Sequence, residues 1–287
     1  MTGRVLTLSA GPARLEIVPD MGGGIAGLWA DGVPVLRTWS GVPDDGPFAL
    51  ACNLLAPFSN RISGGFCWEG QRNALSPNLP GEPCPIHGDA FQRPWEVREA
   101  SGTHAVLALE QGAFGPWRYR ATLHCLLLAE RVDLDLTVTN RGDTALPFGL
   151  GFHPWFPRMA DTALRFAASG VWEEGAGHLP AGTAAVPLPP DWDFHEMRAL
   201  PQGWINNAFA DFGGTLTIAR GAATPVTLSA GEPLSTLVVY SPSAEAEFFC
   251  AEPVSHPVDA VNLPGLPGLR TLAPGEAMTG RMTLGWR

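Results

Sequence analysis

The chain of 287 residues is 45% hydrophobic and 16% charged, and its 34 glycines and 28 prolines are typical of strands joined by many turns, which excludes a disordered chain or a coiled coil. The formal net charge of −10 argues against nucleic acid as a partner and favours a neutral small molecule as the ligand. All 18 basic residues are arginine, and the absence of lysine excludes Schiff-base catalysis and the lysine-containing phosphate-binding loop.

The first segment of the chain is predicted to form strands and a hairpin. Residues 13–18 alternate polar and apolar side chains, which is the pattern of a half-buried strand. Residues 22–27 match the dinucleotide-binding pattern G-x-G-x-x-G, but Asp31-Gly32 follows as a hairpin turn where that motif needs a helix. The glycines therefore indicate a tight turn and not a cofactor site.

The rest of the chain is predicted to be mostly β. Residues 54–89 are dense in glycine, proline and asparagine, and a loop of that length inside a compact domain is usually functional. Residues 131–139 alternate without interruption and stop at a turn. Shorter strands are expected at 215–218, 226–229, 236–240, 247–251 and 280–286. The proline-rich residues 179–190 are predicted to be a surface connection. We expect one all-β domain over residues 1–287, a sandwich or a barrel, because no repeat or shift in composition divides it.

The cysteines and the N-terminal residues indicate in which cellular compartment the protein is expected. The five cysteines never occur as C-x-x-C, which favours free thiols and a reducing environment. The first residues lack the apolar core of a signal peptide, and no run of about 18 apolar residues predicts a membrane span. We therefore expect a cytoplasmic protein, a monomer or a homodimer, with neither membrane nor nucleic acid as a partner.

Two candidate acid–base residues stand immediately before prolines. His153 lies in the run Gly-Phe-His-Pro-Trp-Phe, and histidine is the commonest acid–base side chain near neutral pH. Glu252 follows apolar residues and precedes Pro253, so loss of solvent there would raise its pKa towards useful base strength. Because proline pushes the preceding residue towards extended backbone, both are predicted at strand ends. The structural alternatives are a core histidine bonded to the backbone and a surface glutamate paired with arginine.

Four short motifs occur in one order along residues 22–262. They are Asn60-Arg61-Ile62, Ile86-His87-Gly88, Gly151-Phe152-His153-Pro154-Trp155-Phe156, and Glu252-Pro253 with Ala260-Val261-Asn262. As an ordered set they resemble the aldose 1-epimerase (galactose mutarotase) family. The resemblance implies a galactose mutarotase-like β-supersandwich that binds a neutral aldopyranose in an open cleft and interconverts its α and β anomers. It implies no cofactor and no metal.

The resemblance also implies roles for these residues. Glu252 would be the general base on the O1 hydroxyl, and His153 would be the general acid at the ring oxygen O5. His87 would hydrogen-bond or polarise the sugar near the reacting centre. Arg61, with Asn60 beside it, would orient sugar hydroxyls and help to hold the catalytic carboxylate.

One position departs from the family pattern. The family usually has an aspartate before a phenylalanine in its later half to bind sugar hydroxyls, and in the matching residues 204–209 Asn206 occupies that place. An amide can still bind hydroxyls, but it carries no charge, so the preferred sugar is expected to differ. Among the ten tryptophans, Trp155 is the preferred candidate for stacking on the sugar because it lies two residues past His153, ahead of Trp68 and Trp204.

Three other functions remain open at this stage. His87-Gly88-Asp89 with the distant His153 mimics the two-histidine, one-carboxylate set of a non-haem iron oxygenase, although this leaves Arg61 and Glu252 unexplained. A non-catalytic carbohydrate-binding protein would use the same cleft without needing an acid–base pair. A sugar-phosphate epimerase would need arginines gathered at a phosphate, against an acidic net charge.

Overall fold

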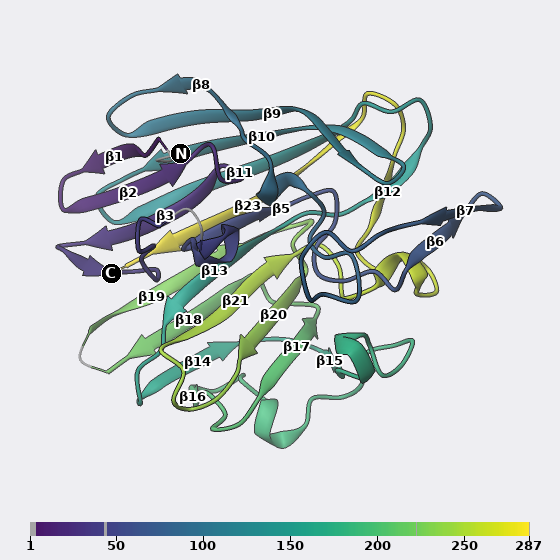
Figure 1. The fold of residues 1–287 in the computed structure, drawn as a ribbon. Helices are drawn as coiled ribbons and strands as arrows, with labels where there is room; N and C mark the ends of the chain where they lie inside the picture. Colours follow the sequence, from purple (N-terminus) through teal and green to yellow (C-terminus); the bar gives the residue numbers. More distant parts are fainter. Residues whose placement is uncertain (1–3, 43–44, 222, 287) are drawn as a thin grey trace.

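Two large antiparallel sheets make up most of the chain, and the computed structural model describes residues 4–42, 45–221 and 223–286 (Figure 1). The larger sheet has ten strands, in the order β1 (Leu6–Ala10), β2 (Ala13–Val18), β3 (Gly24–Ala30), β5 (Cys52–Leu55), β13 (Gly151–Pro157), β21 (Phe248–Val254), β20 (Thr236–Ser241), β17 (Ile205–Ala210) and β15 (Gly170–Trp172), with β4 (Val33–Pro34) paired to β3. The second has nine, in the order β16 (Arg198–Ala199), β14 (Thr162–Phe166), β18 (Thr215–Arg220), β19 (Ala223–Ala230), β23 (Ala277–Gly285), β11 (Arg131–Asn140), β10 (Trp117–Leu127), β9 (His104–Phe114) and β8 (Glu96–Ala100).

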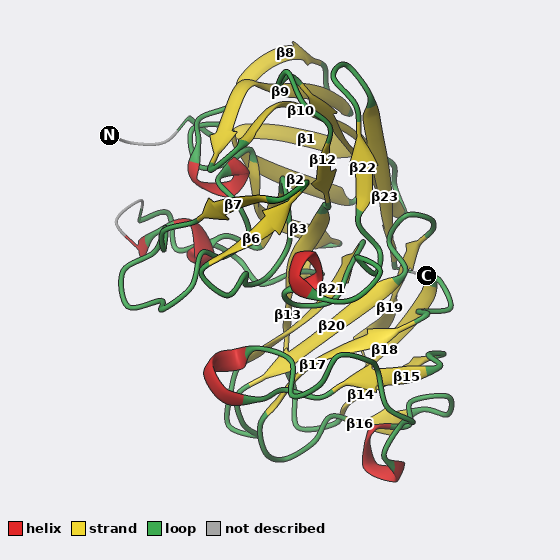
Figure 2. Cartoon of the chain, turned by 90° about the vertical axis from the view of Figure 1, so that its right-hand side faces the viewer, coloured by secondary structure: helices red, strands yellow, loops and turns green. Residues whose placement is uncertain are grey.

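Short elements complete the described part of the chain. Two small ladders pair β6 (Gly65–Trp68) with β7 (Gln71–Ala74), and β12 (Leu146–Phe148) with β22 (Arg270–Leu272). The described helical segments are 3₁₀ turns at Pro47–Ala49, Ala90–Gln92, Ala176–His178, Pro190–Trp192 and Ala260–Asn262 (Figure 2). Within the described ranges, no helix has the length and apolar character needed to cross a membrane. The all-β prediction is therefore confirmed, in its sandwich form.

The core lies between the two large sheets and is built by alternating side chains. In β11 every second residue from Val132 onwards is buried, as the uninterrupted alternation predicted. Phe156 of β13 and Phe249 of β21 stack with ring centroids 5.4 Å apart and belong to the same buried cluster as Val132. Burying each such side chain contributes about 1.5–3 kcal/mol. Because neighbouring strand residues point to opposite faces, this packing turns His153 and Glu252 to the other face of the larger sheet.

The turn predictions near the N-terminus are confirmed. Asp31 and Gly32 have φ of 51° and 77° and connect β3 to β4, as a two-residue hairpin turn requires. Gly22 has φ of 70°, and a Cβ there would lie 2.2 Å from the backbone oxygen of Phe91. The glycine-rich segment is therefore a tight turn with close backbone approach, and a strand follows it instead of a helix.

Other expectations are met with small differences. The five shorter strands expected between residues 215 and 286 occur as β18, β19, β20, β21 and β23, with ends shifted by at most three residues. Residues 179–190 are exposed or half-buried, as a surface connection should be. All five cysteines have free thiols, and Cys67 alone is exposed. The segment 54–89 also contains the hairpin β6–β7, which lacks apolar alternation because most of its residues are exposed or half-buried.

Candidate active site

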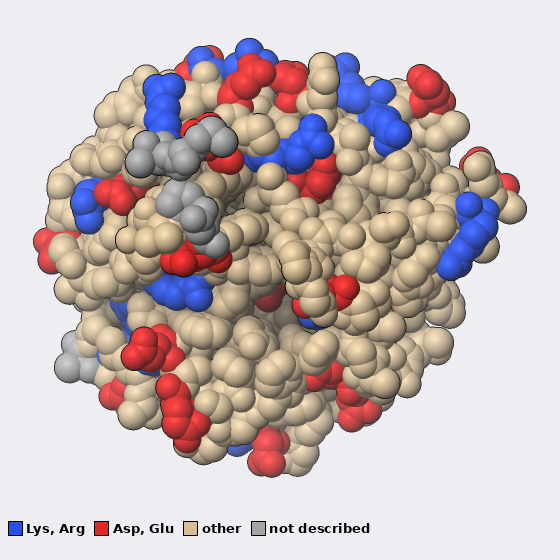
Figure 3. Space-filling model, viewed as in Figure 1, with Lys and Arg blue, Asp and Glu red and all other residues tan. Residues whose placement is uncertain are grey.

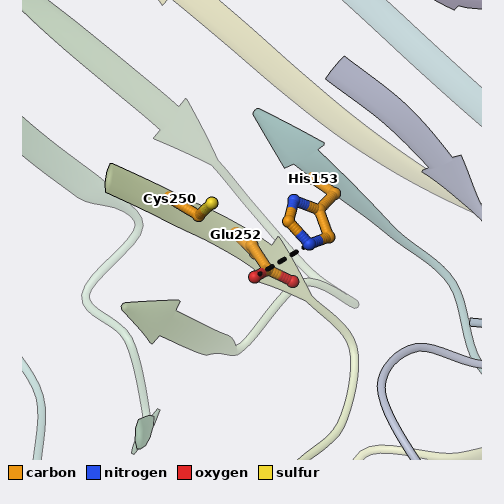
Figure 4. Close-up of side chains that lie close together, drawn as sticks. All are labelled: His153, Cys250 and Glu252. Atoms are coloured by element: carbon orange, nitrogen blue, oxygen red, sulfur yellow. Dashed lines mark ion pairs between the residues drawn. The ribbon is translucent and has the colours of Figure 1, made fainter. Parts of the chain in front are cut away.

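Two neighbouring strands of the larger sheet carry the candidate acid–base pair. Gly151 pairs with Val254 and Trp155 with Cys250, so the register places His153 directly opposite Glu252. The distance from His153 Nε2 to Glu252 Oε1 is 3.3 Å, and Figure 4 shows the two side chains facing each other from adjacent strands. The strand pairing therefore brings together two residues that are far apart in the sequence.

The prediction that both residues end a strand is wrong. His153 is the third residue of β13 and Glu252 the fifth of β21, and each strand continues through the following proline. Proline is compatible with extended backbone and only removes one N–H donor, so the strand loses a hydrogen bond without ending. The location inside strands holds both side chains more rigidly than a strand end would.

Burial controls how the pair is protonated. The side chains of His153 and Glu252 are 8% and 4% exposed. Burial raises the pKa of Glu252 to about 8 and lowers the pKa of His153 to about 3, because both charged forms lose their hydration. At neutral pH the pair therefore holds one proton, on the carboxyl group. Glu252 Oε2 has no hydrogen-bond partner among the described residues, which leaves it available to a ligand hydroxyl.

This protonation predicts a pH-dependent gain in stability for the Glu252→Gln variant. Folding raises the pKa of Glu252 from 4.5 to about 8. The contribution of protonated Glu252 to the free energy of unfolding is therefore complete below pH 4.5 and is lost as the pH rises towards 8. Glutamine resembles the neutral acid and does not titrate. The quantity compared is the free energy of unfolding of the variant minus that of the wild type. We expect this difference to be roughly 2–5 kcal/mol larger at pH 8.5 than at pH 4.5. Urea unfolding at both pH values measures this, and a difference independent of pH would contradict it.

The pair lines a pocket of about 220 Å³. The structure places all seven predicted site residues on its wall: Asn60, Arg61, His87, His153, Trp155, Asn206 and Glu252. The other lining residues are Phe48, Glu82, Ile86, His178 and Tyr240, which were not among the predicted site residues, and Trp204, which was a weaker stacking candidate than Trp155. Pockets for drug-sized ligands measure roughly 300–1,000 Å³, so this one suits a single small ring.

His87 is held as a neutral hydrogen-bond donor. Its Nδ1 accepts a hydrogen bond of 2.9 Å from the backbone N–H of Asn60, which leaves the ring proton on Nε2. Burial lowers the pKa of His87 well below its usual value, so the ring stays uncharged. His87 and Asn60 both have left-handed backbone, with φ of 60° and 53°. Gly88 follows because a Cβ there would lie 2.1 Å from the backbone oxygen of Ala56.

Arg61 binds a different carboxylate from the expected one. It was predicted to help hold Glu252, but its guanidinium forms a bidentate pair with Glu82, with Nε–Oε2 2.9 Å and Nη2–Oε1 2.8 Å. Its positive charge still opposes the effect of burial on the pKa of Glu252. Glu82 lies in the long loop 54–89, where no periodic pattern distinguished it from a surface residue.

Residues after Glu252 anchor the loop that carries Asn60 and Arg61. The backbone N–H of Ser59 donates to His256 Nε2 at 3.0 Å, and Ser63 donates to Asp259 through its N–H at 3.0 Å and its hydroxyl at 2.7 Å. Asn262 Nδ2 also donates to Asp259, at 2.7 Å. The Ala-Val-Asn motif therefore has a structural role, because it positions one wall of the pocket.

Trp155 contacts the candidate acid–base residue His153. Its ring stacks on His153 with centroids 4.9 Å apart and planes 17° from parallel, and the Arg37 guanidinium lies 4.1 Å from its centroid. These contacts fix the orientation of the imidazole, while stacking of Trp155 on a sugar stays a prediction. Trp204 is 47% exposed and offers a freer ring. Trp68 does not line the pocket, and its indole N–H donates to the backbone oxygen of Ala145.

The residues suggested for iron do not form a ligand set. Asp89 accepts a hydrogen bond of 2.5 Å from the Tyr119 hydroxyl and pairs with Arg93 at 3.6 Å, so it supports the core. Among the described residues, the group of side chains close enough to share a metal ion is His153, Cys250 and Glu252 (Figure 4). Burial raises the pKa of the Cys250 thiol well above its usual value, which disfavours the thiolate that binds metals. The two-histidine, one-carboxylate set is therefore not assembled.

The two large antiparallel sheets give the chain the fold of the galactose mutarotase-like proteins. A galactose mutarotase-like protein from Clostridium acetobutylicum shares this fold with a TM-score of 0.86 at 18% identity, over 98% of this chain and 94% of that one. Residues 4–285 match the family model described as aldose 1-epimerase, and the chain belongs to this family.

Two comparisons with Escherichia coli K12 show similarity over nearly the whole chain. The uncharacterised protein YphB is 36% identical over 290 residues, which cover 98% of each chain. The crystal structure of a candidate aldose 1-epimerase has a TM-score of 0.91 at 33% identity, and the match covers 99% of each chain. The predicted family and β-supersandwich are thus confirmed.

Proposed function

We propose that the protein is a mutarotase that interconverts the α and β anomers of a neutral aldopyranose by opening and closing its ring. The observation that carries this proposal is the cross-strand pair of His153 and Glu252, which are 3.3 Å apart and buried in a pocket sized for one ring. Hemiacetal opening needs a base and an acid acting together, and this pair supplies both.

The first step forms the reactive state of the pair. In the empty pocket the proton lies on Glu252, and its transfer to His153 produces the carboxylate and imidazolium that ring opening needs. The positive charge of Arg61 favours this carboxylate. The pyranose can then bind with its O1 hydroxyl against Glu252 and its ring oxygen O5 against His153.

The second step opens the ring without leaving a charge on either oxygen. Glu252 takes the O1 proton as the C1–O1 bond becomes a carbonyl, and His153 gives its proton to O5 as the C1–O5 bond breaks. The pair ends in its neutral form, which burial favours. Rotation about C1–C2 presents the other carbonyl face, and the two groups exchange roles to close the ring. The Nε2–H of His87 can donate to a sugar oxygen near this centre.

The charge of the pocket favours neutral sugars over sugar phosphates. Arg61 is the one arginine among the described lining residues, and its guanidinium is already paired with the Glu82 carboxylate. On the face of the molecule in Figure 3, basic and acidic side chains are interspersed. A phosphate in this pocket would meet two glutamates and no free guanidinium, so its desolvation would be poorly compensated.

Polarimetry tests the reaction and the substrate class together. We expect the protein to accelerate the approach of fresh α-D-glucose or α-D-galactose to the equilibrium rotation, with kcat/KM at least about tenfold above that for glucose 6-phosphate. A preference for the phosphate would identify a sugar-phosphate epimerase. Tight binding of a sugar without any acceleration, over a panel of neutral aldoses, would identify a binding protein instead.

A further inference from the structure

Glu174, just after β15, links three side chains of the pocket wall. Its Oε1 accepts a hydrogen bond of 2.5 Å from Asn206 Nδ2 and lies 2.5 Å from His178 Nδ1, and its Oε2 accepts one of 2.6 Å from Trp204 Nε1. Asn206, His178 and Trp204 line the pocket, whereas Glu174 is behind them with its side chain 18% exposed. No sequence pattern distinguished Glu174 from its neighbours.

The bond to Glu174 sets the orientation of the Asn206 amide. A carboxylate only accepts, so the amide nitrogen of Asn206 must face Glu174, and the amide oxygen must point away from it. None of the described residues donates a hydrogen bond to Asn206 Oδ1, so a residue that lines the pocket keeps one free acceptor. Asn206 thus offers a hydroxyl the same acceptor as an aspartate, while the negative charge lies on Glu174 behind it.

Glu174 also fixes the position of an exposed aromatic ring. The Trp204 indole is bonded to Oε2, stacks with His178 at 5.7 Å between centroids, and meets the edge of Tyr240 at 5.3 Å. Trp204 is 47% exposed and lines the pocket, so its ring can cover the apolar face of a pyranose. Asn206 lies on β17, two strands beyond β21 in the sheet, so this end of the pocket is separate from the acid–base pair.

We propose that Glu174 is a positioning residue that assembles the hydroxyl-binding end of the pocket, and that Glu174 and Asn206 together replace a single aspartate. The ligand of this end is a non-reacting hydroxyl of a neutral pyranose, which donates to Asn206 Oδ1 while the ring stacks on Trp204. This inference rests on the proposed function for the identity of the ligand.

Exchanging the two functional groups tests the pair. Asn206→Asp places a second carboxylate 2.5 Å from Glu174. Glu174→Gln leaves one acceptor oxygen where two accept from Asn206 and Trp204, so the orientation of the Asn206 amide is no longer fixed. In the double variant, the amide nitrogen of residue 174 can donate to the new aspartate while its oxygen still accepts from Trp204. We expect Kd and KM of each single variant to rise roughly 10–100-fold, while kcat changes less than about threefold. In the double variant, Kd and KM should return to within about threefold of the wild-type values.

Kd is measured by quenching of tryptophan fluorescence with D-galactose and D-glucose, and KM and kcat by polarimetry. Glu173→Gln is the matched control, because it makes the same change on the adjacent residue, and it should leave all three constants unchanged. Additive losses in the double variant, or wild-type affinity in Asn206→Asp alone, would overturn the inference. If the wild type binds sugar without turnover, the proposed function fails, and Kd across the same variants still decides the inference. If it neither binds nor turns over any neutral aldose, both are overturned.

Discussion

Replacing Glu252 by glutamine is expected to lower kcat/KM for mutarotation by roughly 10²–10⁴-fold. Glutamine keeps the size of the protonated side chain and its hydrogen bonding, but it cannot take the proton from O1. Because the neutral acid is the form present in the empty pocket at pH 7, sugar affinity should change much less than the rate. Polarimetry gives the rate and fluorescence quenching gives Kd. The exposed Glu96→Gln on β8 serves as the control and should retain wild-type activity.

The same experiment on His153 tests whether the two groups act as one unit. His153→Ala should lose a similar factor, because O5 then has no acid to protonate it as the C1–O5 bond breaks. The double variant should be about as slow as the slower single variant, since either change removes the coupled proton transfer. A double variant slower by the product of the two factors would mean that the groups act independently and would contradict the proposed mechanism.

A fall in kcat/KM above pH 8 is the second large effect we expect, at about tenfold for each pH unit. Catalysis needs one proton in the pair, and kcat/KM reports the ionisation of the free enzyme. Burial raises the pKa of Glu252 to about 8, so above that pH the pair loses its proton and has none to deliver to O5. At the other end, burial lowers the pKa of His153 to about 3, so activity should persist well below pH 6.

Polarimetry from pH 4 to pH 10 measures this profile, with the uncatalysed rate subtracted at each pH. The residual activity of Glu252→Gln should lack the alkaline fall, because the titrating group is gone. An activity that declines below a midpoint near 6.5 would show that the imidazole titrates as if in water, and it would contradict the protonation state derived from burial.

The acid–base pair sits at a site where stability and function conflict. Burial opposes the charge on both His153 and Glu252, and the unpaired Oε2 of Glu252 has no donor among the described residues. The same burial reverses the preference that holds in water, where the carboxylate and the imidazolium are favoured, and places the proton on Glu252 in the empty pocket. In the proposed mechanism the proton therefore returns to Glu252 as the ring opens, which restores the form that burial favours.

Local features of this protein could be derived from the sequence because their causes are local. The alternation of residues 131–139 gave β11 with its buried face, and Asp31-Gly32 gave the hairpin from β3 to β4, since side-chain period and backbone φ depend on neighbouring residues. The ordered motifs pointed to the family and contain six of the seven predicted residues that line the pocket, while Asn206 was found as a departure from the family pattern.

Only the tertiary structure decided which of these residues meet. The register of β13 against β21 sets His153 opposite Glu252, and a shift of one residue would have turned one of them into the core. Glu82 and Glu174 reach Arg61 and Asn206 from irregular segments, where no periodic pattern marks a side chain that points inwards. The order of the strands and the packing of the loops depend on how the two large sheets bury their apolar faces against each other. Contacts between residues far apart in the chain therefore follow from the whole fold and not from any one segment.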